Sequence, residues 1–371
     1  MLRIALVIPT LDRSGAEKQL TWLATGLPRD RFEPHVIALT RGGGYAAELN
    51  SADVPVTVIG KRLKLDPLTI WKLRRQLADF QPDVVHSWLF AANAYTRLFA
   101  PASTRKSAKF VVSERCVDSW KSGWQLALDR RLVTRTDRLV GNSQAVADFY
   151  RELGFDSARL AVIPNAVSIP PRPSISQQEL KQQLHWPADA RIIMYAGRLA
   201  PQKRVRDLLW SCQFLRQADP RTRLLVIGDG PERDALLYFA KQIEVEDFVT
   251  FTGHRDDAAS LLQLADVFWL ASEFEGMSNS LMEAMACGKP VVVSDIAPNR
   301  ELVRHEREGF LAGIGDGVAF AQFTRRLFDD PSLSATIGAA AAERMARLFS
   351  REAMVRSYAT LYEAITTEHA K

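Results

Sequence analysis

The chain has 371 residues, of which 47% are apolar and 25% are charged, and its net charge is +5 at pH 7. This composition is typical of a soluble globular protein of two or three domains. Its cysteines (Cys116, Cys212 and Cys287) have no C-x-x-C spacing, which argues against a disulfide framework or a zinc site, and no apolar run approaches the ~20 residues that cross a bilayer.

The first half of the chain alternates strand-like and amphipathic runs. Strands are predicted at RIALVIP, HVIAL, VPVTVIG, DVVHSW, KFVVS and RLVGNS, with helices between them such as 17–27, 68–80 and 124–134. The first apolar run is too short for a signal peptide and has no cleavage site, so it is interpreted as a strand. This alternation predicts a parallel sheet with helices on both faces.

A proline-rich segment separates this half from a second half with the same pattern. It is interpreted as a linker over residues 168–188. Further strands are predicted at RIIMYAG, RLLVIGDG, FVTFTG, DVFWLAS and KPVVVSD. The two halves predict an α/β protein with two Rossmann-like domains, 1–167 and 189–350, whose parallel sheets face a cleft. A last helix is expected over 351–371.

Two carboxylates in the second half, Glu275 and Glu283, stand eight residues apart. A helix-like run over 281–286 follows a small polar segment, and either Ser278 or Asn279 can cap it, which places Glu283 in or near its first turn. The helix start attracts anions, so two acceptors beside it suit a ligand with hydroxyls and phosphates, such as a sugar nucleotide. The alternative is a solvated loop charge and a helix-start acid that bind nothing.

The stretch ASEFEGMSNSLMEAMACGKPVVV (271–293) closely resembles the E-x7-E signature of retaining glycosyltransferases of family four. Those enzymes have the GT-B fold of two Rossmann-like domains, and the resemblance implies that the last helix, 351–371, crosses back to the first domain. The resemblance implies that Glu275 contacts the hydroxyls of the donor sugar and that Glu283 holds the ribose hydroxyls of the nucleotide. It places the residues between them in the donor site as well, namely Ser278, Asn279 and Ser280.

A second motif follows the first strand of the second half. Gly197 allows close backbone approach at a strand end, and Arg198 and Lys203 supply two cations that can stabilise a departing nucleoside diphosphate. The family has the same G-R-x4-K pattern, with these residues on the donor phosphates. The resemblance therefore makes Arg198, Lys203 and Glu275 the candidate catalytic residues. The alternative is a pair of surface cations.

Two loops give weaker donor-site candidates. Gly15, in the loop Leu11–Glu17 after the first strand, resembles the family's G-G-A-E loop, although Ser14 replaces its first glycine. The alternative is an ordinary turn with Glu17 as a helix-start acid. Arg255 lies in a loop that, in relatives, borders the nucleotide base.

Four residues at strand ends in the first half are candidates for acceptor or donor-sugar contacts. The resemblance implies H-x-H at the end of DVVHSW, with the second histidine on the donor sugar, but this chain has Trp88 there. Either Trp88 stacks on a sugar face or another polar group serves. His86 is interpreted either as a site residue or as a satisfied structural histidine. Arg115 and Asn142 follow later strands and are equally typical of strand-end turns.

The resemblance implies a retaining, metal-independent hexosyltransferase. It would move a sugar from a nucleoside-diphosphate sugar, UDP- or GDP-hexose, to an acceptor hydroxyl, with no cofactor and no metal ion. Its partners would be the nucleotide sugar and a glycan or lipid-linked acceptor in polysaccharide assembly. Two alternatives are open: a catalytically impaired sugar-nucleotide-binding relative, which Trp88 favours, and a GT-B sugar-nucleotide epimerase, which the combined motifs disfavour.

Positive charge is concentrated in the first half. Residues 1–170 carry 24 Lys and Arg against 16 Asp and Glu, whereas the remainder carries 24 against 27. This imbalance suits an anionic membrane surface or a phosphorylated acceptor, and equally an ordinary solvated surface. Nucleic acid is not expected, because no nucleic-acid-binding motif accompanies the charge. The expected location is the cytoplasm, free or peripheral on the inner face of the cell membrane.

Overall fold

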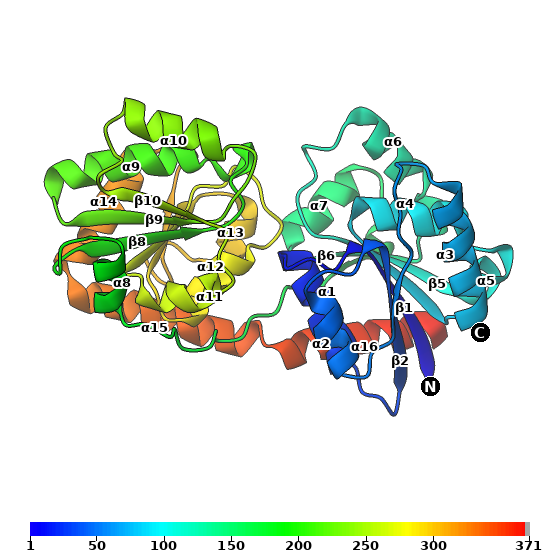
Figure 1. Cartoon of the computed structure of the whole chain (residues 1–371). Coiled ribbons are helices and arrows are strands. Elements are labelled where there is room, and N and C mark those ends of the chain that lie inside the picture. The colour runs from blue at the N-terminus through cyan, green and yellow to red at the C-terminus, as the bar shows by residue number, and fades with distance from the viewer. Residues whose placement is uncertain (368–371) are drawn as a thin grey trace. The chain divides into compact units, whose positions relative to one another are not determined.

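The computed structural model describes residues 1–367, which form two compact units. The first unit is Met1–Ala166 together with the last helix, and the second is Val167–Ser350. Both are α/β units with a parallel sheet (Figure 1). Of the helix expected over 351–371, residues 368–371 lie outside the described residues. No helix within residues 1–367 has both the length and the apolar character needed to span a membrane.

The first unit has a seven-stranded sheet in the order β3-β2-β1-β4-β5-β6-β7, with every pair parallel. The strands are β1 (Leu2–Thr10), β2 (Phe32–Arg41), β3 (Val56–Val58), β4 (Val84–Trp88), β5 (Lys109–Glu114), β6 (Arg138–Gly141) and β7 (Leu160–Val162). Its helices are α1 (Gly15–Gly26), α2 (Tyr45–Ser51), α3 (Pro67–Phe80), α4 (Leu89–Phe99), α5 (Ala102–Ser107), α6 (Gly123–Arg131), α7 (Gln144–Glu152) and α16 (Arg351–Thr367), with short 3₁₀ turns at Val133–Arg135 and Ser157–Arg159.

Alternate residues of β1 build separate cores on the two faces of this sheet. Leu6 packs in a core that includes Leu20 of α1 and Tyr362 of α16, whereas Val7 packs in a core that includes Leu73 of α3. The alternation follows from the two-residue period of a strand. α16 therefore completes one face of a sheet whose strands all lie before residue 163 of the chain (Figure 1).

The second unit has a six-stranded parallel sheet in the order β10-β9-β8-β11-β12-β13. The strands are β8 (Arg191–Ala196), β9 (Thr222–Ile227), β10 (Val249–Gly253), β11 (Val267–Leu270), β12 (Val291–Ser294) and β13 (Phe310–Ala312). Its helices are α8 (Gln177–Gln183), α9 (Val205–Ala218), α10 (Arg233–Gln242), α11 (Ala258–Leu261), α12 (Asn279–Ala286), α13 (Ala297–Leu302), α14 (Gly317–Asp329) and α15 (Pro331–Leu348), with 3₁₀ turns at Pro201–Lys203 and Leu262–Leu264. β8 and β12 are continuous apolar runs because both faces of the sheet are covered.

Residues 168–188 differ from the expected linker. They belong to the second unit and contain α8, whose Leu180 is buried in the core of that unit together with Trp186. The proline-rich start of the segment masked this helix in the sequence, although Ser176 and Glu179 form a capping box at its beginning.

Candidate functional site

The order of strands in the second sheet reverses between β8 and β11, and both strands end at this point. Their register pairs Val267 with Ile193 and Phe268 with Met194, so the two carboxyl ends lie at one level. In open parallel sheets, ligands bind outside the carboxyl ends of the strands at such a reversal. The loop after β8 carries the G-R-x4-K motif, and the loop after β11 carries Glu275.

Lys203 and Glu275 meet across this reversal. The Lys203 Nζ contacts Glu275 Oε1 as a close ion pair, and the two side chains are only 15% and 8% exposed. Ser272 Oγ donates to the same carboxylate oxygen at 2.7 Å. The backbone reinforces the pairing of the loops, because Glu273 N donates to Gln202 O at 2.8 Å. The structure thus brings together one cation and one carboxylate from the two separate motifs.

The loop after β8 approaches neighbouring backbone closely because of its glycines. A Cβ on Gly228 would lie 1.9 Å from Gly197 O, and Gly228 itself has φ +137°, a value that favours glycine. Tyr195 Oη donates to Arg198 O at 2.9 Å, which fixes the loop from below. Burial raises the pKa of Tyr195 well above its usual value, so this hydroxyl stays a donor. Arg198 itself is exposed at the surface of the loop.

The helix after Glu275 begins one residue beyond its cap. Ser278 is the cap, its Oγ accepting from Leu281 N at 3.4 Å and lying 3.3 Å from Ser280 Oγ, while Asn279 is the first helical residue. Glu283 is therefore the fifth residue of α12, in its second turn. Glu283 directly follows the first turn, which agrees with the expected placement in or near that turn, and Ser278 is the one of the two expected caps that the helix uses.

Arg255 is engaged within its own loop. Its guanidinium makes two hydrogen bonds to the Asp257 carboxylate, at 2.8 and 2.7 Å, which raises the pKa of the arginine and lowers that of the aspartate. The loop follows β10, two strands from the reversal, and reaches toward it through Gly228 N, which donates to Gly253 O at 2.9 Å.

In the first unit, His86 and Trp88 of β4 have no exposed surface. His86 Nδ1 lies 2.6 Å from the Tyr362 hydroxyl and Nε2 lies 2.8 Å from Ser113 Oγ, so both ring nitrogens have partners. Burial, together with the nearby Arg115, holds the pKa of His86 well below its usual value. This environment is that of a neutral, satisfied structural histidine.

The Arg115 side chain lies over the ring of Trp88. Its guanidinium carbon lies 4.3 Å from the ring centroid, and the group donates to Asn165 Oδ1 at 2.6 Å and to Tyr358 Oη at 3.3 Å. Burial lowers the pKa of Arg115. Contact between Trp88 and a sugar therefore requires the Arg115 side chain to move. Tyr358 and its neighbour Tyr362, both from α16, are the members of this cluster that the sequence did not reveal.

Two polar atoms of the cluster have no hydrogen-bond partner within residues 1–367. They are Arg115 Nε and Asn142 Oδ1, although Asn142 Nδ2 donates to Arg115 O at 3.3 Å. Buried polar atoms are normally paired, but Ser87 Oγ and Asn93 Oδ1 in the same unit share this state, so the two atoms do not by themselves mark a ligand site. The strand order of the first sheet reverses between β1 and β4. Gly15 is the first residue of α1, in the connection that follows β1.

The loop between Arg115 and α6 is held by a buried ionic cluster that the sequence did not reveal. Lys121 Nζ lies 3.3 Å from Glu114, 3.0 Å from Asp118 and 3.0 Å from Asp129, while Arg97 donates to Asp129 at 2.7 Å. Burial raises the pKa of Glu114 to about 8. The charges of Asp118 and Asp129 raise it further, whereas the Lys121 ammonium opposes the shift. The cluster anchors the segment that follows Arg115.

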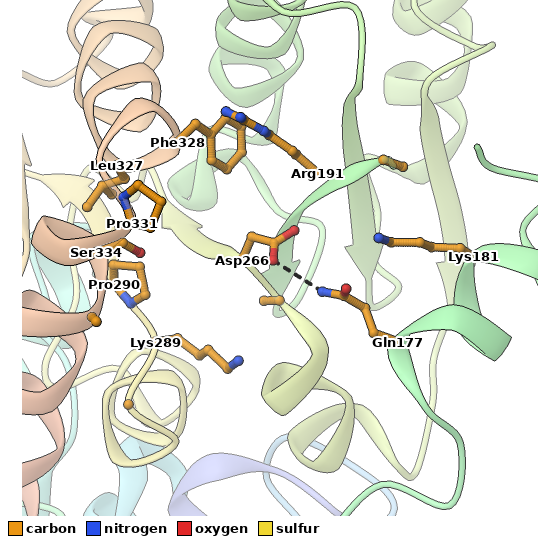
Figure 2. Close-up of a pocket in the computed structure, with 14 residues that line it drawn as sticks. Gln177, Lys181, Arg191, Asp266, Lys289, Pro290, Leu327, Phe328, Pro331 and Ser334 are labelled. Atoms are coloured by element: carbon orange, nitrogen blue, oxygen red, sulfur yellow. Dashed lines mark hydrogen bonds between the residues drawn. The ribbon is translucent and has the colours of Figure 1, made fainter. Parts of the chain in front are cut away.

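The second unit also has a cavity of about 470 Å³, and Figure 2 shows the side chains that line it. Its lining includes residues at the amino-terminal ends of three strands. Arg191 is the first residue of β8, Asp266 precedes β11 and Lys289 lies two residues before β12. The Asp266 carboxylate has a structural role, because it accepts hydrogen bonds from Ile192 N at 2.6 Å and from Gln177 Nε2 at 3.2 Å. The cavity is at the opposite edge of the sheet from Lys203 and Glu275.

The two parallel-sheet Rossmann-like units define a protein of the GT-B fold. Its structure is similar to that of HepE from Anabaena in a complex with UDP-glucose, with a TM-score of 0.87, 24% identity and coverage of 98% of this chain and 100% of that one. The model described as "Glycosyltransferase Family 4" matches residues 13–169, and "Glycosyl transferases group 1" matches residues 176–344.

Two relatives from Rhizobium meliloti (strain 1021) match along nearly the whole chain. The lipopolysaccharide core biosynthesis glycosyltransferase LpsE is 30% identical over 354 residues, which are 94% of this chain and 95% of that protein. The lipopolysaccharide core biosynthesis glycosyltransferase LpsD is 27% identical over 350 residues, with the same two coverages. The chain belongs to glycosyltransferase family 4, and it is a glycosyltransferase.

Proposed function

We propose that the chain transfers a hexose from a nucleoside-diphosphate sugar, UDP- or GDP-linked, to an acceptor hydroxyl with retention of anomeric configuration and without a metal ion. The observation that carries the proposal is the contact between Lys203 and Glu275. It joins the G-R-x4-K and E-x7-E motifs at the carboxyl edge of one sheet, where α/β proteins bind nucleotides. Support for the donor class comes from HepE, whose structure is a complex with UDP-glucose.

In this reaction the acceptor oxygen forms a bond to the anomeric carbon on the face from which the nucleoside diphosphate leaves. The bond between that carbon and the phosphate oxygen breaks, and the departing phosphate takes the proton of the acceptor hydroxyl. The protein then has two tasks, positioning the reactants and stabilising the negative charge on the leaving group. Lys203 and Arg198 take the second task.

The pairing of Lys203 with Glu275 suits a donor that carries both phosphates and sugar hydroxyls. A phosphate competes for the Lys203 ammonium, and hydroxyls donate to the Glu275 carboxylate, so one ligand satisfies both partners of the ion pair. Glu283 holds the ribose hydroxyls. Ser278, Asn279, Ser280, Gly197, Gly15 and Arg255 complete the proposed donor site.

The acceptor is a glycan or lipid-linked glycan, and the biological role is assembly of a surface polysaccharide. LpsD and LpsE, named for lipopolysaccharide core biosynthesis, support this assignment. The basic first half supports a peripheral location on the inner face of the cell membrane.

The test is release of nucleoside diphosphate from UDP-, GDP-, ADP- and dTDP-sugars in EDTA, with and without an extract of lipid-linked acceptors. Release from one donor that rises with the extract is the expected result, and NMR of the product gives the anomeric configuration. Release that requires an added divalent cation would contradict metal independence. An inverted product would contradict retention.

The second candidate is a nucleotide-sugar-binding relative without transfer activity. The burial of Trp88 beneath Arg115 favours it, because the indole N–H of Trp88 donates to His86 Nδ1 at 3.4 Å and is not directed to a sugar. If the folded protein binds a nucleotide but releases none from any donor, this candidate replaces the transferase. Trp88→His is then the variant to make, and a gain of transfer would identify the missing contact.

A further inference from the structure

The segment KRLKLDPLTIWKLRR (61–75), here called the docking segment, gathers exposed apolar side chains between β3 and the second turn of α3. Its exposed apolar members are Leu63, Leu65, Leu68 and Trp71, which are 64%, 70%, 58% and 54% exposed. Single exposed apolar residues are ordinary, but four within nine positions concentrate exposed apolar surface on one short segment, which is typical of an interaction site.

Hydrogen bonds hold the backbone of the docking segment in a defined conformation. Asp66 caps α3 by accepting from Leu68 N at 3.1 Å and Thr69 N at 3.3 Å, and its second oxygen accepts from Arg62 N at 3.0 Å. Tyr95 Oη donates to Lys64 O at 2.7 Å. The loop therefore has a fixed course, along which Leu63 and Leu65 stay exposed.

The helical part of the segment has one buried face and one exposed face, as the period of the helix dictates. Leu73 and Leu77 are buried against the sheet, whereas Leu68 and Trp71, with Arg75 one turn further, follow the exposed stripe at i, i+3 and i+7. The Arg75 guanidinium lies 5.6 Å from the Trp71 ring centroid. The exposed stripe thus ends in a tryptophan beside a cation, an arrangement that suits the boundary between lipid tails and headgroups.

The charge of the segment is strongly positive. It contains six Lys and Arg residues against one acid, Asp66, so its net charge equals the +5 of the entire chain. The carboxylate of Asp66 is tied to backbone N–H groups, which hold its pKa at about 2. α5 packs beside α3 and adds Arg105 and Lys106, both exposed.

We infer that the docking segment binds the surface of a bilayer that contains anionic lipids, with Leu63, Leu65, Leu68 and Trp71 entering the interface and the surrounding cations contacting lipid phosphates. Apolar side chains interleaved with cations match a surface that is apolar beneath and anionic above. The inference rests on the proposed function, because an enzyme that glycosylates a lipid-linked acceptor must reach its substrate at a membrane.

The test is co-sedimentation of the full chain with vesicles of phosphatidylcholine alone and of phosphatidylcholine with phosphatidylglycerol. We expect binding to the mixed vesicles that weakens with salt. Leu63→Ser with Leu65→Ser should weaken partitioning by about tenfold or more, because two apolar anchors are lost. Lys64→Glu with Arg75→Glu should abolish the preference for phosphatidylglycerol.

Matched controls lie on the second unit. Leu237 and Tyr238 of α10 are exposed, and Leu237→Ser with Tyr238→Ser likewise replaces two large exposed side chains with serine. Lys241→Glu with Arg347→Glu reverses two exposed cations there. Equal loss of binding in these controls, or wild-type binding that is the same for both vesicles, would overturn the inference. Binding that needs a membrane protein added to the vesicles would point to a protein partner instead and also overturn it.

Failure of this inference and failure of the proposed function give different results. Sugar transfer to a lipid-free acceptor fragment, with no vesicle binding, leaves the function standing and refutes the docking segment. Vesicle binding that is lost in Leu63→Ser with Leu65→Ser, without release of nucleoside diphosphate from any donor, supports the docking segment and refutes the transferase.

Discussion

The Lys203 ammonium lies against the Glu275 carboxylate at a site where both side chains are nearly buried. Two sequence motifs supplied these residues more than 70 positions apart, and the reversal of strand order explains why they meet. The sequence could not reveal that Ser272 donates to the same carboxylate, because a serine at a strand end carries no distinctive pattern.

Replacing Lys203 with alanine should lower kcat for sugar transfer by about 10²- to 10³-fold, while the Kd for the nucleoside diphosphate changes much less. The reason is that leaving-group charge is greatest in the transition state. Steady-state rates and calorimetric binding measure the two effects. Arg206→Ala is the matched control, since Arg206 is an exposed cation three residues away that packs over the Phe239 ring. An unchanged kcat in Lys203→Ala would remove Lys203 from the phosphate role.

Replacing Glu283 with alanine should weaken nucleoside-diphosphate binding by about ten- to a hundredfold, the value of a charge-assisted hydrogen bond. Glu273→Ala is the control, because Glu273 is an exposed glutamate in the preceding loop. A 2′-deoxynucleotide should bind the wild type and Glu283→Ala with similar affinity. If Glu283→Ala binds the ribonucleotide as tightly as the wild type does, the ribose assignment is wrong.

At the scale of elements, local signals predict most of the strands and several of the helices, and the failures occur where partners are distant. The cap, the apolar run and Gly288 predict α12, and the structure confirms Ser278 as its cap. The helix α8 was missed because prolines precede it. The loop between β5 and α6 owes its course to Arg97, Glu114, Lys121 and Asp129, which lie on different elements. No spacing rule connects these four residues, so only the structure reveals the cluster.

The buried cluster predicts how stability depends on pH. The folded pKa of Glu114 is raised from 4.5 to about 8, so between these values the folded chain holds a proton that the unfolded chain lacks. The free energy of unfolding should therefore fall as pH rises through this window, by at most about 1.4 kcal/mol per pH unit, and level off above it. Urea unfolding followed by hydrogen exchange in β5 and β6 measures the slope.

Glu114→Gln should remove this slope, because glutamine keeps the shape and cannot titrate. Glu152→Gln on α7 is the control, since Glu152 is exposed and its replacement should leave the slope unchanged. A steep fall with rising pH that persists in Glu114→Gln would assign the proton to another member of the cluster.

On the scale of the whole molecule, the second unit is inserted between the body of the first unit and its last helix. α16 packs on α1, and Arg351 at its start donates to Trp22 O at 3.3 Å. Tyr358 and Tyr362 are fully buried among first-unit residues and contact His86 and Arg115. The alternation of strands and helices predicted two Rossmann-like domains. It could not predict which face α16 completes, because the partners of Tyr362 lie over 270 residues away.

This arrangement predicts that a substitution in the core face of α16 will destabilise the first unit. Tyr362→Ala should destabilise the first unit by about 3–5 kcal/mol, since it leaves a cavity in the core shared by β1 and α1 and removes the hydroxyl paired with His86. Hydrogen exchange should accelerate in β1, β4 and α1, with β8 and β12 unchanged. Phe320→Ala is the matched control in the second unit, where Phe320 is buried against Trp269 at a ring distance of 5.8 Å. That variant should accelerate exchange in β8 and β11 and spare β1. Uniform acceleration across both sheets in either variant would mean that the two units unfold as one, and the assignment of α16 to an independently stable first unit would be wrong.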